Sequence, residues 1–239
     1  MSRDLDRRRL LGRALAFGAL SVLPGCNYDD LQHPDFADRA LRVVSRWNDR
    51  VQAALFDPHT LAPTFPASAI TRPPRFNAFY DEAHVHAVDG ASWQLELFGN
   101  IAEKRPWRLA DLRAAPQESQ ITRLICVEGW RVVGQWGGVP LGWFLRRIGA
   151  DTKARYVSFR CADGYYESID MASALHPQTL LALDFLGQPL TPPFGFPLRL
   201  RIPTKLGFKN PKSLVALGVT NVFPGGYWVA QGYNWFSGS

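Results

Sequence analysis

The sequence predicts an α+β domain with a mixed, mainly β core and short helices. Three segments alternate apolar and polar residues with the period of a strand: 93–97, 156–160 and 198–202. Three helical patterns lie among them: 109–114, 140–148 and 171–175. Helices this short do not supply repeated crossovers between parallel strands, so a doubly wound sheet is not expected. The chain shows neither an internal repeat nor a low-complexity segment.

The first 25 residues have the pattern of an export leader. Arg7-Arg8-Arg9 precedes the apolar segment 14–23, which is too short to span a bilayer as a permanent helix. Paired arginines before Leu10-Leu11 resemble a twin-arginine signal, the route of proteins that load a cofactor before crossing the membrane. The alternative is a basic amphipathic start. The leader predicts a periplasmic product.

Leu23-Pro24-Gly25-Cys26 closes the leader and resembles a lipobox, in which cleavage before the cysteine leaves a thiol for lipid attachment. A lipid on Cys26 would tether the domain to a membrane. The alternative is ordinary signal cleavage nearby, which leaves Cys26 as an incidental thiol.

Charge and composition argue for one globular domain and against a nucleic-acid partner. The 239 residues carry a net charge of +6, and the five arginines and two aspartates of 1–25 supply half of it. No basic run is interleaved with aromatic residues, so nucleic-acid binding is not expected. The rest is rich in Trp and Phe and long enough to bury a large core.

Residues 26–75 are expected to form an N-terminal helix and a proline-rich linker, before a domain over 76–239. Apolar residues recur at helical spacing in 35–56, which predicts an amphipathic helix that ends at Asp57-Pro58. The prolines that follow predict a loop extended over the surface.

Several familiar catalytic signatures are absent from the sequence. There is no G-x-G-x-x-G after a strand, no Walker loop, no H-E-x-x-H, no G-x-S-x-G and no C-x-x-C. The sequence therefore gives little support for an enzyme that uses a nicotinamide cofactor, a nucleotide or zinc. His84 and His86 are expected on a solvent-facing loop, whereas His176 is either structural or directed into a site.

Cys126 is the thiol that the sequence places best for chemistry. With no partner nearby in the sequence, it forms neither a zinc knuckle nor a local disulfide, although Cys161 is available as a distant partner. Three roles remain open from the residues alone: a ligand for a soft metal, a nucleophile, or an inert core residue.

Three separated motifs resemble the sulfite-oxidase-fold molybdopterin oxidoreductases, and within them the catalytic subunit of the periplasmic methionine sulfoxide reductase. They are Phe76-Asn77-Ala78-Phe79-Tyr80-Asp81, then Arg123-x-x-Cys126-Val127-Glu128-Gly129-Trp130, then 197–213, which begins Pro197-Leu198-Arg199 and ends Asn210-Pro211-Lys212-Ser213. The resemblance runs from about Thr71 to Leu217 and implies a molybdenum-molybdopterin cofactor.

The resemblance implies that Cys126 is the molybdenum ligand, adding its thiolate to the two sulfurs of the pterin dithiolene. It implies that the following residues bind the cofactor: Asn77, Tyr80, Asp81, Cys161, Arg199, Asn210, Pro211 and Lys212. Arginine and lysine there suit the cofactor's phosphate. The alternative for Arg199, Asn210 and Lys212 is ordinary surface polar groups.

Two positions depart from the methionine sulfoxide reductase pattern. Cys161 stands where that group has a threonine, and Phe194 stands where it has an asparagine. Cys161 either tunes the metal site or fills space. Phe194 lacks the polar side chain of asparagine, which is expected to affect substrate choice.

The resemblance implies an exported oxidoreductase that removes an oxygen atom from an S-oxide such as methionine sulfoxide, on a small molecule or a protein. The alternatives are a sulfite-type oxidase and a metal-free lipoprotein that keeps the fold as a binding module. No C-x-x-C-H haem signature is present, so a separate membrane haem protein is the expected electron partner. The aromatic tail 223–238 either closes the core or lines a substrate funnel, and leaves no room for a further immunoglobulin-like domain.

Overall fold

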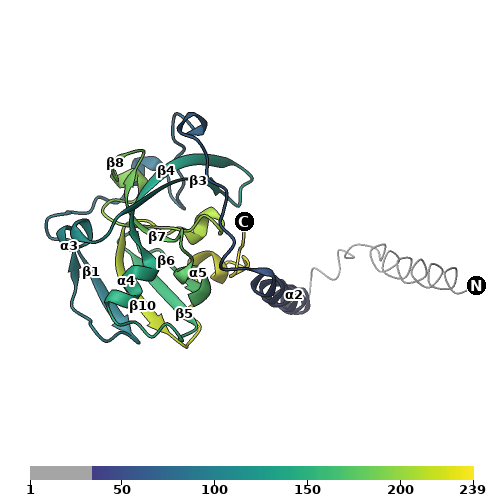
Figure 1. Cartoon of the computed structure of the whole chain (residues 1–239). Coiled ribbons are helices and arrows are strands. Elements are labelled where there is room, and N and C mark those ends of the chain that lie inside the picture. The colour runs from purple at the N-terminus through teal and green to yellow at the C-terminus, as the bar shows by residue number, and fades with distance from the viewer. Residues whose placement is uncertain (1–33) are drawn as a thin grey trace, which may run out of the picture. The chain divides into compact units, whose positions relative to one another are not determined.

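The structure is a computed structural model that describes residues 34–239, with side chains from residue 41 onward. Residues Arg46–Ser239 form one compact unit. Within it two five-stranded sheets carry the fold (Figure 1). The strands of the first sheet, in spatial order, are β2 (Trp107–Arg108), β1 (Gln94–Gly99), β10 (Leu214–Thr220), β5 (Tyr156–Cys161) and β6 (Tyr166–Asp170). Those of the second are β3 (Glu118–Ile125), β4 (Arg131–Pro140), β7 (Leu180–Phe185) and β8 (Gln188–Pro189), with β9 (Arg199–Arg201) paired to β7.

The helices are short, apart from the first. They are α2 (Pro34–Leu55), α3 (Leu109–Ala114), α4 (Leu141–Arg147), α5 (Met171–Leu175) and α6 (Tyr227–Ala230). Single 3-10 turns lie at Ala67–Ala69, Glu82–His84, Pro192–Phe194 and Gly207–Lys209. Among the residues described, no helix is both long enough and apolar enough to cross a membrane.

The main core lies against the first sheet. In β1, Leu95 and Leu97 are buried and Gln94 and Glu96 are exposed, which is the alternation that predicted this strand. Strand β1 runs parallel to β10, and the other pairs of this sheet are antiparallel. Helices α4 and α5 contribute buried residues to the same cluster.

The second sheet is built on a long hairpin. Strands β3 and β4 pair from Glu118↔Gly138 to Ile125↔Arg131, and the proline-rich loop lies along them. There the Phe65 backbone N–H donates to the Ile121 carbonyl at 3.0 Å. The loop therefore runs over the outside of the hairpin, as the sequence predicted.

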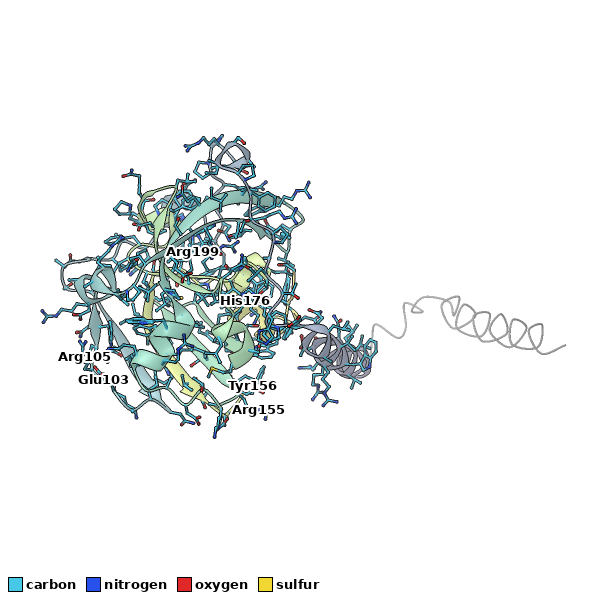
Figure 2. All side chains as sticks on the ribbon, viewed as in Figure 1. Glu103, Arg105, Arg155, Tyr156, His176 and Arg199 are labelled. Atoms are coloured by element: carbon cyan, nitrogen blue, oxygen red, sulfur yellow. The ribbon has the colours of Figure 1, made fainter. Side chains whose placement is uncertain are left out.

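The predicted α+β class is confirmed, and so are the helices at 35–56, 109–114, 140–148 and 171–175, to within a residue or two at their ends. The strand predicted at 198–202 exists as β9, but its arginines are not surface groups. Arg199 is 1% exposed and Arg201 is 0% exposed, so the alternation there does not mark a solvent face (Figure 2). Figure 2 also shows the opposite case, the Arg105–Glu103 ion pair at the surface.

Candidate functional site

Cys126 lies at the hairpin turn between β3 and β4. Its backbone N–H donates to the Trp130 carbonyl at 2.9 Å, and the Gly129 N–H donates back to the Cys126 carbonyl at 3.1 Å. Gly129 adopts a φ of 88°, a left-handed conformation that glycine takes without a steric cost. The turn is therefore tight, and it presents a half-buried thiol to a cavity.

Glu128 and Trp130 surround the thiol. The Cys126 Sγ lies 3.8 Å from Glu128 Oε2, and the Trp130 indole N–H donates to the same oxygen at 2.7 Å. Burial raises the pKa of the Cys126 thiol, and the negative charge of Glu128 acts in the same direction, against two backbone N–H groups. A cation beside the sulfur would oppose both effects and favour the thiolate.

The loop 75–82 forms the opposite wall of the cavity and contains three of the expected residues. Asn77, Tyr80 and Asp81 all line it. Burial, followed by Asp163, raises the pKa of Tyr80 to about 12, so its hydroxyl remains a donor across the ordinary pH range. The Asn77 side-chain oxygen accepts from Arg199 at 3.4 Å, which joins the loop to β9.

Three cations of the segment that follows are buried, and only the last of them lines the cavity: Arg199, Arg201 and Lys212. Arg199 donates to the Phe194 carbonyl at 3.2 Å, and Lys212 donates to the Pro193 carbonyl at 2.9 Å. The guanidinium groups of Arg199 and Arg201 both lie over the Trp136 ring, at 4.9 and 5.4 Å from its centre, respectively. Among residues 41–239, none of the three cations forms an ion pair with a carboxylate.

The pKa values of these three cations reflect the lack of a carboxylate partner among the residues described. Burial lowers the pKa of Arg199 to about 10, while burial and the charge of Arg199 lower that of Arg201 to about 9. Burial and Arg199 likewise lower the pKa of Lys212 to about 7, although Asp163 and Glu82 oppose this from a distance. The Nε atoms of both arginines also have no hydrogen-bond partner. Buried cations in this state are stabilised by an anionic ligand.

Asn210 and Pro211 lie on the cavity wall, but the Asn210 amide is already engaged within the protein. Its oxygen accepts from Arg201 at 3.0 Å and from the Ile202 N–H at 2.8 Å, and its nitrogen donates to the Leu206 carbonyl at 3.0 Å. Asn210 therefore holds the loop that follows β9 and orients Arg201.

Cys161 lies beside the site rather than on its wall. It is 5% exposed at the end of β5, its thiol is free, and it is not among the residues that line the Cys126 cavity. Burial raises its pKa well above the ordinary value. Cys26 lies outside the described residues, as does the whole leader.

Two further predictions about histidines are settled by burial and contacts. His84 and His86 are exposed on the loop before β1, as expected. His176 is buried, its Nε2 lies 3.1 Å from the Thr60 carbonyl, and its Nδ1 accepts from the Gln178 N–H, so its role is structural. The described residues contain no cluster of three or more His, Cys, Asp or Glu suited to a metal.

Sequence reasoning gave no role to several residues that complete the cavity. They are Arg75, Phe76, Glu128, Trp130, Asp163, Tyr165 and Phe208. Arg75 stacks on Trp130 at 4.5 Å, and the Tyr165 hydroxyl donates to the Phe208 carbonyl at 2.8 Å. Glu128 and Trp130 belong to the same sequence motif as Cys126. Their closeness to Cys126 in the sequence could have identified them as cavity residues.

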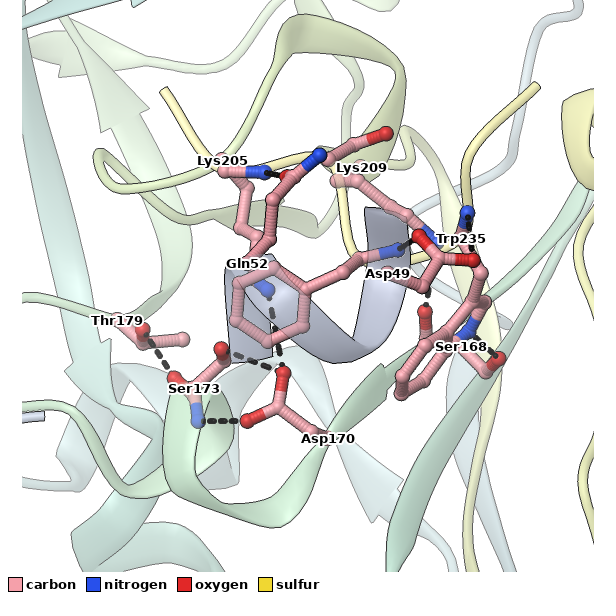
Figure 3. Close-up of polar contacts among 12 residues, drawn as sticks. Asp49, Gln52, Ser168, Asp170, Ser173, Thr179, Lys205, Lys209 and Trp235 are labelled. Atoms are coloured by element: carbon pink, nitrogen blue, oxygen red, sulfur yellow. Dashed lines mark hydrogen bonds and ion pairs between the residues drawn. The ribbon is translucent and has the colours of Figure 1, made fainter. Parts of the chain in front are cut away.

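The aromatic tail divides between the two expected roles. Trp228 lines the cavity, whereas Phe236 is 3% exposed and closes the core. Near the end of the tail, Trp235 donates to the Ser168 hydroxyl at 2.9 Å (Figure 3). The Asp49 carboxylate accepts from the Phe236 N–H at 2.8 Å. The segment therefore contributes to the core and to the cavity wall, and a role in a substrate funnel stays a prediction.

Comparison with known proteins agrees with this geometry. Residues 82–228 match the family model of the oxidoreductase molybdopterin binding domain. The chain is 54% identical over 98% of its length to a proposed subunit of a protein-methionine-sulfoxide reductase, YedZ1, from Azospira oryzae, and covers 88% of that protein.

More distant relatives carry related names. The chain is 37% identical over 57% of its length to the protein-methionine-sulfoxide reductase catalytic subunit MsrP of Xanthomonas axonopodis, and spans 47% of that protein. The MsrP of Ralstonia nicotianae is 36% identical, with 46% of it covered.

A solved structure shares the fold. It is the sulfane dehydrogenase SoxCD from Paracoccus pantotrophus, with a TM-score of 0.54 at 18% identity, over 58% of this chain and 40% of that one. The chain belongs to the family of oxidoreductases with a molybdopterin-binding domain.

Proposed function

We propose that this chain is exported, ligates molybdenum through Cys126, and removes an oxygen atom from an S-oxide such as methionine sulfoxide. The names of its relatives support the substrate class. The single observation that carries the proposal is a cavity lined by the free thiol of Cys126 and by the buried Lys212, with Arg199 buried next to Lys212.

The residues present fit a molybdopterin cofactor on chemical grounds. A soft thiolate suits a soft metal centre, and the raised pKa of Cys126 means that the thiolate form needs a cation beside it. Arg199 and Lys212 are buried without a counterion, and a phosphate monoester supplies one. The cavity presents both the Cys126 thiol and the Lys212 ammonium, which supports a metal ligand and an anion site in one place.

When bound, the cofactor supplies a metal that exchanges two electrons and takes up an oxygen atom. In the proposed reaction a sulfoxide gains two electrons and two protons, its S–O bond breaks, and the products are a thioether and water. The protein's part is to hold and orient. Trp130, Phe208 and Trp228 give the cavity aromatic walls, which suit the sulfur and methyl groups of methionine.

The electrons are proposed to come from a separate membrane haem partner, because the sequence has no haem attachment motif of its own. The relative from Azospira oryzae is named as a subunit, which supports a partner. The twin-arginine pattern supports export to the periplasm, and the lipobox-like sequence at Cys26 supports a lipid tether that keeps the two proteins close.

The test is turnover by the purified, metal-loaded chain. Reduced viologen should be oxidised with methionine sulfoxide and related S-oxides, and less well with N-oxides. A sulfite-type oxidase would instead oxidise sulfite with an electron-accepting dye. A metal-free binding module would contain no molybdenum after export from a cofactor-competent host. Cys126→Ser is the matched control, and full activity in that variant would refute the ligand assignment.

A further inference from the structure

Helix α2 leaves large apolar side chains in solvent. Trp47 is 64% exposed and Leu55 is 80% exposed, both within the compact unit that begins at Arg46. Earlier in the same helix Leu41 is 66% exposed and Val44 is 59% exposed. Positions 44, 47, 51 and 55 recur every three or four residues, which places them on one stripe of a helix.

A basic stripe adjoins the apolar one. Arg42, Arg46 and Arg50 follow one another at intervals of four residues, and all three are exposed. A third side of the helix is held to the domain. There Asp49 accepts from the Trp235 N–H at 3.2 Å (Figure 3). Gln52 accepts from the Gly238 N–H at 2.9 Å. The apolar residues are thus not the ones that attach the helix to its own protein.

We propose that α2 lies in the plane of an anionic lipid bilayer, with its apolar stripe in the headgroup boundary and its arginines facing lipid phosphates. An interfacial helix typically has Trp, Leu and Val beside a stripe of arginines and is too polar to span a membrane. Helix α2 has this pattern. The arginines select a negatively charged surface.

Charge complementarity favours a membrane as the occupant over a protein groove. An anionic bilayer supplies phosphates for the exposed arginines of α2 and an apolar layer for Trp47 and Leu55 on the adjoining stripe. The inference needs neither a lipid on Cys26 nor any redox activity. It would hold if the proposed reaction were wrong.

Quenching of Trp47 by brominated lipid tests the proposal directly. The full, cofactor-loaded chain carrying Cys26→Ser is mixed with phosphatidylglycerol vesicles whose acyl chains are brominated. Subtracting the spectrum of the same chain with Trp47→Phe isolates the Trp47 signal, because the replacement keeps the site apolar. Most of that signal should be lost with anionic vesicles and little with phosphatidylcholine vesicles.

Two sets of variants test the apolar stripe and the basic stripe of α2 separately. Leu55→Asp should abolish Trp47 quenching, whereas Val222→Asp, at another exposed apolar residue, should leave it unchanged. Arg42→Gln with Arg50→Gln should raise the lipid concentration for half-quenching about fivefold for each charge removed. Unquenched Trp47 on vesicle-bound protein would overturn the proposal. So would concentration-dependent self-association that Leu55→Asp abolishes, because the apolar stripe would then cover a second copy.

Discussion

Two groups of buried cations in the segment 199–212 differ in their counterions. Lys205 lies 3.2 Å from Asp170 (Figure 3). Lys209 donates to Glu167 at 2.7 Å, so both lysines are neutralised within the fold. Arg199, Arg201 and Lys212 are also buried but form no ion pair with any residue described, and their contacts are with carbonyls, amides, hydroxyls and aromatic rings. The charges of the first group are paired with carboxylates, whereas those of the second group form no ion pair among the described residues.

The largest expected difference between the groups is in stability. Lys209→Met leaves Glu167 buried without its partner, and should lower the free energy of unfolding of the cofactor-free protein by about 3–5 kcal/mol. Lys212→Met removes an uncompensated charge, and should cost less than about 1 kcal/mol or stabilise. Urea denaturation of both variants checks this.

Adding Glu167→Leu to Lys209→Met is the control, because it removes the orphaned carboxylate. It should recover much of the lost stability. Equal losses in Lys209→Met and Lys212→Met would show that the two groups do not differ.

The cation group without carboxylates should matter most for retaining cofactor. Arg199→Met should reduce retention of the pterin by about tenfold to a hundredfold, because a hydrogen bond to a charged group is worth about 1.5–3 kcal/mol. The readout is pterin and molybdenum content per folded protein after dialysis. Arg113→Met is the matched control, since Arg113 pairs with Asp184 on the surface, and normal retention in Arg199→Met would contradict the assignment.

The pH dependence of stability should also separate the groups. Lys212 has its pKa lowered from 10.5 to about 7 in the folded protein, so above pH 7 the unfolded chain binds the extra proton. The contribution of Lys212 therefore makes the cofactor-free protein more stable as pH rises from about 7 to 10.5, by at most about 1.4 kcal/mol per pH unit. Comparing denaturation of the wild type and Lys212→Met at several pH values isolates this slope.

Bound phosphate or cofactor should flatten the slope, because an anion restores the proton to Lys212. A Lys212→Met variant with the same pH dependence as the wild type would show that Lys212 keeps its ordinary pKa, and hence that something in the fold already neutralises it.

The smallest expected effect concerns the thiol. Glu128→Gln removes a nearby negative charge, so the pKa of Cys126 in the cofactor-free protein should fall, although burial remains the larger cause of its elevation. The pH dependence of alkylation by iodoacetamide, in a Cys26→Ser background, measures it. An unchanged profile would mean that the Glu128 carboxylate does not act on the sulfur.

Much of the fold was visible in the sequence because its signals are local. The period of two in β1 and the helical periods of α3 and α5 survive unchanged in the structure. Strands β4 and β7 were not predicted. Gly134, Gly137 and Gly138 interrupt the alternation in β4, and β7 is buried on both faces, which erases the polar half of the pattern.

The cavity was predicted in part. Cys126 and the 76–81 loop came from recognisable motifs, and the structure brings them together around one space. That Arg199 and Arg201 are wholly buried was not predictable, because an alternating Leu-Arg-Leu-Arg strand normally exposes its arginines. The role of Asn210 was not predictable either, because its side-chain amide forms hydrogen bonds with the protein's own backbone.

The central claim is that the Cys126 sulfur binds molybdenum. Molybdenum X-ray absorption of the exported chain, beside Cys126→Ser with its pterin content verified, tests this most directly. The account predicts that the wild type has one more sulfur ligand than the variant, while both retain pterin. The same number of sulfur ligands in the two proteins would contradict it.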